Sequence, residues 1–212
     1  MRRHRYASLP ALILVLGLQG CPAIIGAGGI AAVGSLEDRR TTGTQLDDGA
    51  IESRAASRIS ERLGERVHIN VTAFNRAVLL TGEAWDAQTR AEVERIVAEV
   101  PNVRSVTNEI QVAGLSSTTS RANDTALTTK VKSRMINVPG LNSLHVKVVT
   151  EASVVYLLGL VTEAEAETAT DIARTTGGVR KVVKVFEYCK GTDELCKAPT
   201  PSTHPARPKP GV

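Results

Sequence analysis

The sequence has few aromatic residues and no long hydrophobic run, and each shortage limits what the protein can be. Aromatic residues make up 3% of the chain, so the domain cores must be built from valine, isoleucine, leucine and alanine. The apolar runs over residues 9–18 and 22–34 are both shorter than the roughly 20 residues that a membrane-spanning helix needs. The sequence therefore predicts aliphatic domains and no spanning helix.

The motifs of common enzymes are absent as well. No HExxH, CxxC or GxSxG pattern occurs, and the glycine-rich stretch at 26–29 lacks the lysine of a phosphate-binding loop. A catalytic site needs a nucleophile or base with an orienting partner. His4 and His204 lie near the chain ends, while His68 and His145 occupy equivalent places in an internal repeat, which is typical of a structural position. We therefore expect no catalytic residues, no metal and no cofactor.

The charge balance does not indicate a nucleic-acid partner. The chain has 26 Lys and Arg against 22 Asp and Glu, a net charge of +4. Residues 1–20 hold three of the arginines and no acid, so the rest of the chain has 23 basic residues against 22 acidic ones, a net charge of +1. Because most of the basic excess belongs to this first segment, we expect no nucleic-acid partner.

That first segment has the order of an export signal. Its arginines form a positive n-region, residues 9–18 form an apolar stretch, and Leu18-Gln19-Gly20-Cys21 closes the segment. This order predicts a secretory signal over residues 1–20. The LxGC ending resembles the lipobox of bacterial lipoproteins, in which the cysteine is lipidated and becomes the new N-terminus. The resemblance implies that Cys21 is the lipidation site and that residues 21–46 form a lipid-anchored linker.

Within that linker, the apolar and glycine-rich stretch at 22–34 has two interpretations. Beside a lipid anchor it could rest in the membrane interface, or it could be a flexible tether. The polar residues 35–45 that follow are typical of a linker.

The other two cysteines fit an exported protein. Cys189 and Cys196 flank a polar, glycine-containing segment that can turn back on itself. In an oxidising compartment such a pair favours a local disulfide. Two free thiols remain an alternative, and without a nearby histidine the pair makes at best half a metal site.

An internal repeat begins at Asp47 and determines the expected fold. Residues 47–112 align with residues 123–188 at an offset of 76 or 77 positions, as two diverged copies of one domain would. The matched positions include Asp48 with Asp124, His68 to Val71 with His145 to Val148, Leu79 to Gly82 with Tyr156 to Gly159, and Val103 to Val106 with Val179 to Val182.

Hydrophobic periodicity gives each copy the order α-β-β-α-β. The first copy is expected to have helices over 48–63 and 86–100 and strands over 67–73, 77–81 and 103–112, with Asp47 or Asp48 as the first N-cap. The second is expected to have helices over 124–137 and 163–176 and strands over 144–150, 153–158 and 179–188. We therefore predict an α+β fold of two tandem small sandwiches, each with two helices on a three-stranded mixed sheet. The expected divisions are a domain at 47–113, a linker at 114–122, a domain at 123–190 and a Pro-rich disordered tail at 191–212.

This arrangement resembles the BON domain. The resemblance rests on a glycine that closes the second strand of each copy, an acidic and alanine-rich helix after it, and the valine-rich strand start that follows. These residues are Gly82 and Gly159, then Val103-Arg104-Ser105-Val106 and Gly178-Val179-Arg180-Lys181-Val182. From residue 9 to residue 188 the chain is similar to the outer-membrane lipoproteins that have two BON domains.

The resemblance implies that the first helix of the second copy binds anionic phospholipid such as phosphatidylglycerol or cardiolipin. On that helix Lys130 and Arg134 are four residues apart, and an ideal helix would expose the apolar Ile136. Basic residues beside an exposed apolar residue suit an anionic membrane surface. From the residues alone, a solvated charged face is the alternative. The predicted contact residues are Ala126, Lys130, Ser133, Arg134 and Ile136, although a bulkier residue than alanine is expected at 126 in similar proteins.

The first helix of the first copy lacks this pattern. Its arginines at 54, 58 and 62 are interspersed with glutamates at 52, 61 and 65, and no exposed apolar residue is evident. We expect the first copy to serve packing or protein contacts.

The resemblance also implies a location and a role. It places the protein at the outer membrane, lipid-anchored on the periplasmic face, and Pro22 rather than aspartate after the lipidated cysteine agrees with that sorting. It implies a role in envelope integrity, with enrichment at division sites. One alternative is a periplasmic adaptor that binds an envelope protein such as outer-membrane assembly machinery. Another is a polysaccharide ligand, against which the scarcity of aromatic residues argues.

Overall fold

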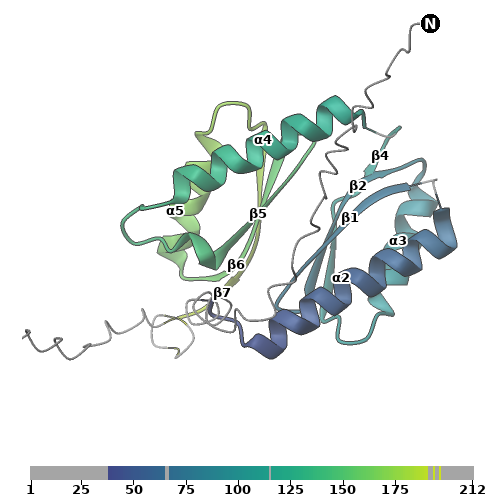
Figure 1. Cartoon of the computed structure of the whole chain (residues 1–212), viewed down its shortest axis with the longest axis horizontal. Helices are drawn as coiled ribbons and strands as arrows, with labels where there is room; N and C mark the ends of the chain where they lie inside the picture. Colours follow the sequence, from purple (N-terminus) through teal and green to yellow (C-terminus); the bar gives the residue numbers. More distant parts are fainter. Residues whose placement is uncertain (1–37, 65–66, 115, 191–192, 194–195, 197–212) are drawn as a thin grey trace, which may run out of the picture.

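Two α-β-β-α-β units follow one another along the chain (Figure 1). The computed structural model describes residues 38–64, 67–114, 116–190, 193 and 196. The first unit consists of α2 (Thr42–Leu63), β1 (Val67–Phe74), β2 (Ala77–Ala84), α3 (Ala87–Ala98), β3 (Ser105–Asn108) and β4 (Gln111–Val112). The second consists of α4 (Thr118–Met135), the short 3₁₀ helix η2 (Ser143–His145), β5 (Val146–Glu151), β6 (Val154–Val161), α5 (Glu163–Arg174) and β7 (Lys181–Tyr188). The predicted α+β fold of two sandwiches is confirmed.

Both sheets are mixed, as predicted. In the first, β2 pairs antiparallel with β1 and parallel with β3 and β4, which lie one after the other along the same edge. In the second, β6 pairs antiparallel with β5 and parallel with β7. Each hairpin closes with two residues of positive φ, which are Asn75 and Arg76 in the first unit and Ala152 and Ser153 in the second. Such left-handed pairs match the twist of the flanking strands.

The first helix of each unit begins six residues earlier than the sequence predicts. The N-caps are Thr41 and Ser117, whose hydroxyls accept hydrogen bonds from the backbone N–H groups three residues on. The helices therefore extend into the stretches that the sequence assigns to linkers, and the predicted N-cap at Asp47 or Asp48 is wrong.

The repeated aspartate holds the hairpin turn instead of a helix end. The carboxylate of Asp48 is buried and accepts the N–H groups of Asn75 at 2.8 Å and Arg76 at 2.7 Å. Asp124 does the same for the second hairpin, at 2.9 Å and 2.8 Å. A buried carboxylate needs such partners, so each turn and each first helix are fixed together in the same way.

Aliphatic cores lie between the helices and the sheets. One face of α2, formed by Ile51, Ala55, Ile59 and Leu63, is buried. The stripe of Leu127, Val131 and Met135 on α4 is buried as well. A third cluster lies between the two sheets, where Phe74 and Leu79 meet residues of β6. The helix-free faces of the sheets thus pack against each other, and the layers follow the order helices, sheet, sheet, helices (Figure 1).

Polar contacts across the sheets fix the two units relative to each other. Asn70 donates to Glu151 at 2.7 Å, and Lys147 donates to Glu52 at 2.9 Å. Arg104, just before β3, pairs with Glu187 of β7. The two units therefore share a packed interface in addition to a covalent linker.

Candidate functional site

The expected contact helix, α4, has one buried face and one exposed face. Leu127, Val131 and Met135 of α4 are buried, while Ala126 and Ser133 are exposed. The Ser133 hydroxyl donates to the carbonyl of Lys130 at 3.0 Å. The outer face of α4 is therefore available to a partner.

Two of the expected basic residues have a structural role that the sequence does not indicate. Lys130 donates to the carbonyl of Gly177 at 3.0 Å. Arg134 donates to the carbonyl of Ile172 at 2.8 Å and to the hydroxyls of Thr175 and Thr176 at 3.2 Å and 2.5 Å. Positive groups at a helix C-terminus satisfy its free carbonyls and oppose the negative end of its dipole. These side chains therefore hold the end of α5, while their charges stay exposed.

The first unit repeats this arrangement. Arg58, which is 76 residues before Arg134, donates to the carbonyl of Glu99 at the C-cap of α3 at 2.9 Å. A contact that both copies make supports a role in packing the two helices of each unit. Arg134 is therefore a poor choice for a variant meant to test charge alone.

Lys132 has no such role. Its side chain is exposed and makes no hydrogen bond or ion pair with any residue that the structure describes. The sequence places Lys132 further round the helix from the predicted row. The structure instead places Lys132 and Ile136, which are four residues apart, in the lining of one groove.

Two apolar side chains are exposed at the end of α4. Ile136 is the C-cap residue, its backbone is extended, and its relative exposure is 56%. Leu144, on η2, is 52% exposed and lines the same groove. The sequence places Leu144 at the start of a strand, where alternation cannot show its exposure, so this residue was missed.

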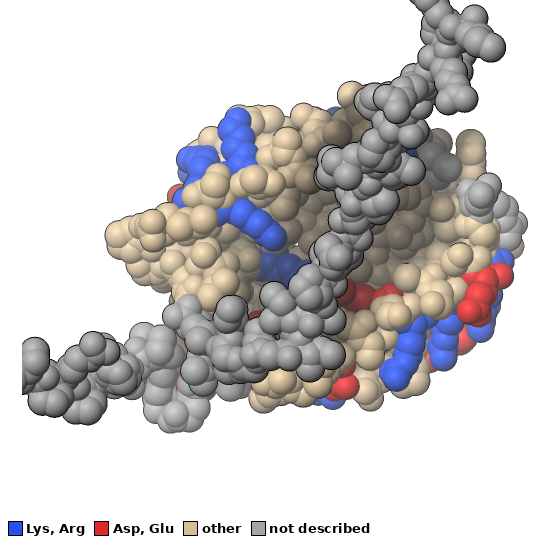
Figure 2. All heavy atoms as spheres, viewed as in Figure 1, with Lys and Arg blue, Asp and Glu red and all other residues tan. Residues whose placement is uncertain are grey.

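The stretch of sequence that contains these side chains has charges of one sign. From residue 125 to residue 150 the sequence has four lysines and arginines and no aspartate or glutamate. Figure 2 shows the result, with blue side chains gathered over the second unit and blue and red interleaved over α2. A surface of one sign attracts ligands of the opposite sign. The end of α4 is therefore positive and partly apolar.

The residues just before α2 join the two units. Arg39 donates to both carboxylate oxygens of Glu165 in the second unit, at 2.7 Å and 3.0 Å, and to the carbonyl of Leu160 at 2.9 Å. Arg40 bonds to Asp48 in the first unit at 2.7 Å and lies over the Phe74 ring, 4.1 Å from its centroid. The sequence assigns both arginines to a linker, and no local signal identifies the contacts of Arg39, whose partners are more than 100 residues away.

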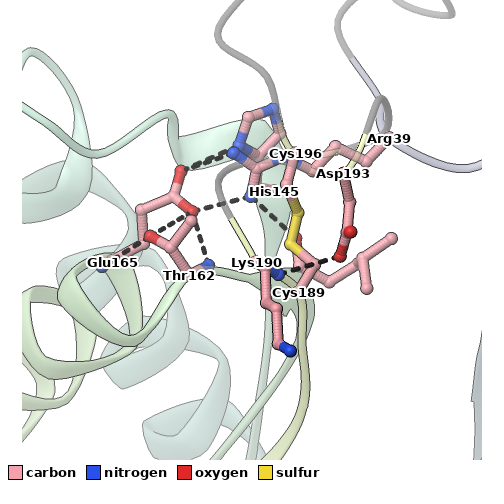
Figure 3. The surroundings of a disulfide bond; sticks show 9 residues. Arg39, His145, Thr162, Glu165, Cys189, Lys190, Asp193 and Cys196 are labelled. Carbon is pink, nitrogen blue, oxygen red and sulfur yellow. Dashed lines mark hydrogen bonds and ion pairs between the residues drawn. A yellow bond between two sulfur atoms is a disulfide. The ribbon is translucent and has the colours of Figure 1, made fainter.

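Glu165 is the centre of a buried polar cluster (Figure 3). The side chains of Arg39 and Glu165 are 8% and 9% exposed. His145 lies 3.2 Å from Glu165 through Nδ1, and the backbone N–H of Thr162 donates to Glu165 at 2.8 Å in a capping box. Burial would raise the pKa of Glu165, but the hydrogen bonds from Arg39, Thr162 and His145 outweigh it and lower the pKa to about 2.

This lowered pKa predicts how stability depends on acid. A carboxyl group whose pKa is lower in the folded than in the unfolded state stabilises the fold above its ordinary pKa. For Glu165 that stability is present above pH 4.5 and is lost as the pH falls toward about 2. We expect the melting temperature of Glu165→Gln to change less over this interval than that of the unchanged protein. An identical acid dependence in both proteins would contradict this assignment.

Cys189 and Cys196 form a disulfide with Cα atoms 6.1 Å apart, beside this cluster (Figure 3). The predicted signal over residues 1–20, the lipidation site Cys21 and most of the predicted tail lie outside the described residues. None of the helices in the described ranges is both long enough and apolar enough to span a membrane.

Comparison with known proteins identifies the family. The BON domain model matches residues 47–114 and 123–190. The outer membrane lipoprotein DolP of Haemophilus influenzae is 36% identical over 186 residues, covering 85% of this chain and 96% of that protein. The 21 kDa hemolysin of Actinobacillus pleuropneumoniae is 35% identical over 153 residues, covering 71% of this chain and 79% of that protein. The osmotically-inducible protein Y of Escherichia coli is 29% identical over 144 residues, covering 66% and 72%.

The chain therefore belongs to the BON family, and it has two BON domains. Within that family it is an outer-membrane lipoprotein of the DolP type.

Proposed function

We propose that this protein is anchored through a lipid on Cys21 to the periplasmic face of the outer membrane and that its second BON domain binds anionic phospholipid there. The observation that carries the proposal is the end of α4. It combines Lys132, which has no partner in the described part of the chain, with the exposed apolar Ile136 and Leu144, in a stretch of 26 residues without an acid. Basic residues attract anionic headgroups while apolar side chains enter the interface.

The anchor and this site support each other. A few basic residues hold a membrane only weakly, but an anchored chain presents its binding site at high effective concentration. Arg39 bonds to the second domain and Arg40 to the first, so the start of the described chain is fixed to both domains. A lipid anchor on Cys21 would therefore hold the two packed domains at the membrane together. We propose that the lipid attaches the protein and that α4 selects regions rich in phosphatidylglycerol or cardiolipin, including division sites, in support of envelope integrity.

A change at Lys132 tests the charge. Residues 35–212 contain every described contact and lack Cys21, so this chain measures binding without the anchor. Each basic residue near an anionic surface contributes about 1 kcal/mol, and Lys132→Glu also adds a charge that the surface repels. We therefore expect this variant to weaken co-sedimentation with phosphatidylglycerol vesicles by roughly thirtyfold.

The matched control is Arg54→Glu on α2, an exposed position with no partner among the described residues. It changes net charge equally and is expected to leave vesicle binding nearly unchanged. Equal losses in both variants would contradict a specific site on α4. Lys130→Glu with Arg134→Glu should also abolish binding, but its thermal melt must be compared because both residues hold α5.

A protein partner is the second candidate function. Trp85 and Val112 are both more than half exposed, and Val112 pairs with Ala84, the residue before Trp85. An exposed apolar patch of this kind on the first domain fits an adaptor that binds an envelope protein. If this patch binds the partner, Trp85→Ala should remove a site-specific crosslink to that partner in cells and leave vesicle binding unchanged.

A further inference from the structure

A groove of about 390 Å³ opens where the two domains meet. Its walls come from the end of α4, from η2 and β5, and from Arg40 and Phe74 of the first domain. This volume lies within the range of roughly 300–1,000 Å³ that is typical of small-molecule sites. The groove is therefore large enough to hold part of a ligand.

The lining changes from exposed to buried apolar side chains. Ile136 and Leu144 are more than half exposed, whereas Phe74, Met135 and Val146 are at most 5% exposed. Among the described residues of the lining, Ser143 has the only neutral polar side chain. A peptide needs partners for its backbone groups, and these side chains offer it few. An aliphatic chain needs none.

The described residues of the lining also include three cations and no acid. Arg40 is bonded to Asp38 and Asp48, and Lys147 is bonded to Glu52. Lys132 is the remaining cation, and it has no partner among the described residues. One free positive charge beside an apolar groove complements a ligand with one anionic group and an aliphatic chain.

We propose that this groove takes one acyl chain of an anionic phospholipid, with the phosphate against Lys132. The inference rests on the proposed function and goes beyond it, because surface contact requires neither the buried lining nor any residue of the first domain. Arg40 lies 19 residues after Cys21, so an anchored chain keeps the groove within about 70 Å of the membrane. The membrane is therefore the nearest source of such a ligand.

A photoreactive lipid tests this placement. Residues 35–212 would be irradiated with vesicles of phosphatidylglycerol that carries a diazirine at the end of one acyl chain, and the adducts mapped by mass spectrometry. We expect adducts on Phe74 and Val146 in addition to Ile136 and Leu144. The adduct on Phe74 distinguishes groove occupancy from surface contact, because Phe74 belongs to the first domain and α4 can contact a membrane without it.

Two variants separate groove occupancy from surface binding. Ser143→Trp fills the groove and should remove the adduct on Phe74, whereas Thr129→Trp adds the same ring to an exposed position of α4 outside the lining and should keep it. Lys132→Gln should lower the yield of that adduct about fivefold. A thermal melt checks that each variant is folded.

Three other outcomes would overturn the inference. Adducts confined to Ile136 and Leu144, unchanged by Ser143→Trp, would contradict the groove and leave surface binding intact. A diazirine fatty acid that labels Phe74 when the phospholipid does not would show that the ligand is a free fatty acid. Failure of the unchanged protein to bind the vesicles at all would contradict the proposed function as well.

Discussion

Arg39→Ala is expected to lower the free energy of unfolding by about 3 kcal/mol, because breaking a buried ion pair leaves the remaining charge without compensation. Arg39 and Glu165 are both more than nine-tenths buried, and Arg39 also donates to the carbonyl of Leu160. The loss should appear in urea denaturation, and hydrogen exchange should place it around the start of α5.

An exposed ion pair in the same domain provides the control. Arg174 and Asp171 are more than half exposed, so Arg174→Ala should cost much less stability than Arg39→Ala. If Arg39→Ala cost no more than Arg174→Ala, residues 38–41 would be a linker, as the sequence alone predicts. The larger loss would show that this stretch belongs to the folded protein and joins the two domains.

Gly82→Ala is expected to destabilise the first domain by about 3 kcal/mol or more, which is among the largest effects of a single substitution. A Cβ at Gly82 would lie 1.9 Å from the carbonyl oxygen of His68 on the neighbouring strand, and φ at Gly82 is +110°. Neither the backbone of β1 nor this dihedral can adjust cheaply. Thermal and urea unfolding would both measure the loss.

Gly49→Ala is the matched control for this substitution. Gly49 lies within α2, and a methyl group at this position would have no neighbouring atom within 4 Å among the described residues, so alanine should stabilise the helix by up to about 1 kcal/mol. Gly159 repeats the close contact in the second domain, where a Cβ would lie 2.3 Å from the carbonyl oxygen of His145. If Gly82→Ala and Gly49→Ala had similar effects, the glycine at the end of the second strand would not be required by the fold.

The repeat explains why so much of the fold could be predicted. Because each helix and strand pattern occurs in both copies, each assignment has two independent observations. The element order and the mixed sheets could therefore be predicted. The helix starts were wrong because aspartate is a common N-cap, and here Asp48 and Asp124 bond to hairpin turns 27 to 29 residues away. Only the folded chain brings those groups together.

The packing of the two sheets could not be predicted from periodicity. Residues on both faces of β2 are apolar, with Val78 and Leu80 in the core under the helices and Leu79 between the sheets. An apolar sequence of this kind predicts that both faces of the strand are buried. It does not predict whether a helix or another sheet covers the face opposite the helices. The sequence predicts only that a short linker, residues 114–122, joins the two domains.

The candidate site was predicted in part. The exposed face of α4 and the exposure of Ile136 follow from helical spacing. The bonds of Lys130 and Arg134 to the end of α5 join residues 38 to 47 positions apart, so spacing on one helix cannot show them. Helical spacing could not identify Leu144 either, because Leu144 lies beyond the helix and approaches Ile136 only after the chain turns.

Binding of the unacylated chain to membranes tests the central claim most directly. Residues 35–212 would be sedimented with vesicles of phosphatidylglycerol and, separately, of phosphatidylcholine. The account predicts binding to phosphatidylglycerol that weakens as salt is raised, because exposed charges are screened, and little binding to phosphatidylcholine. Equal and negligible binding to both lipids would contradict it.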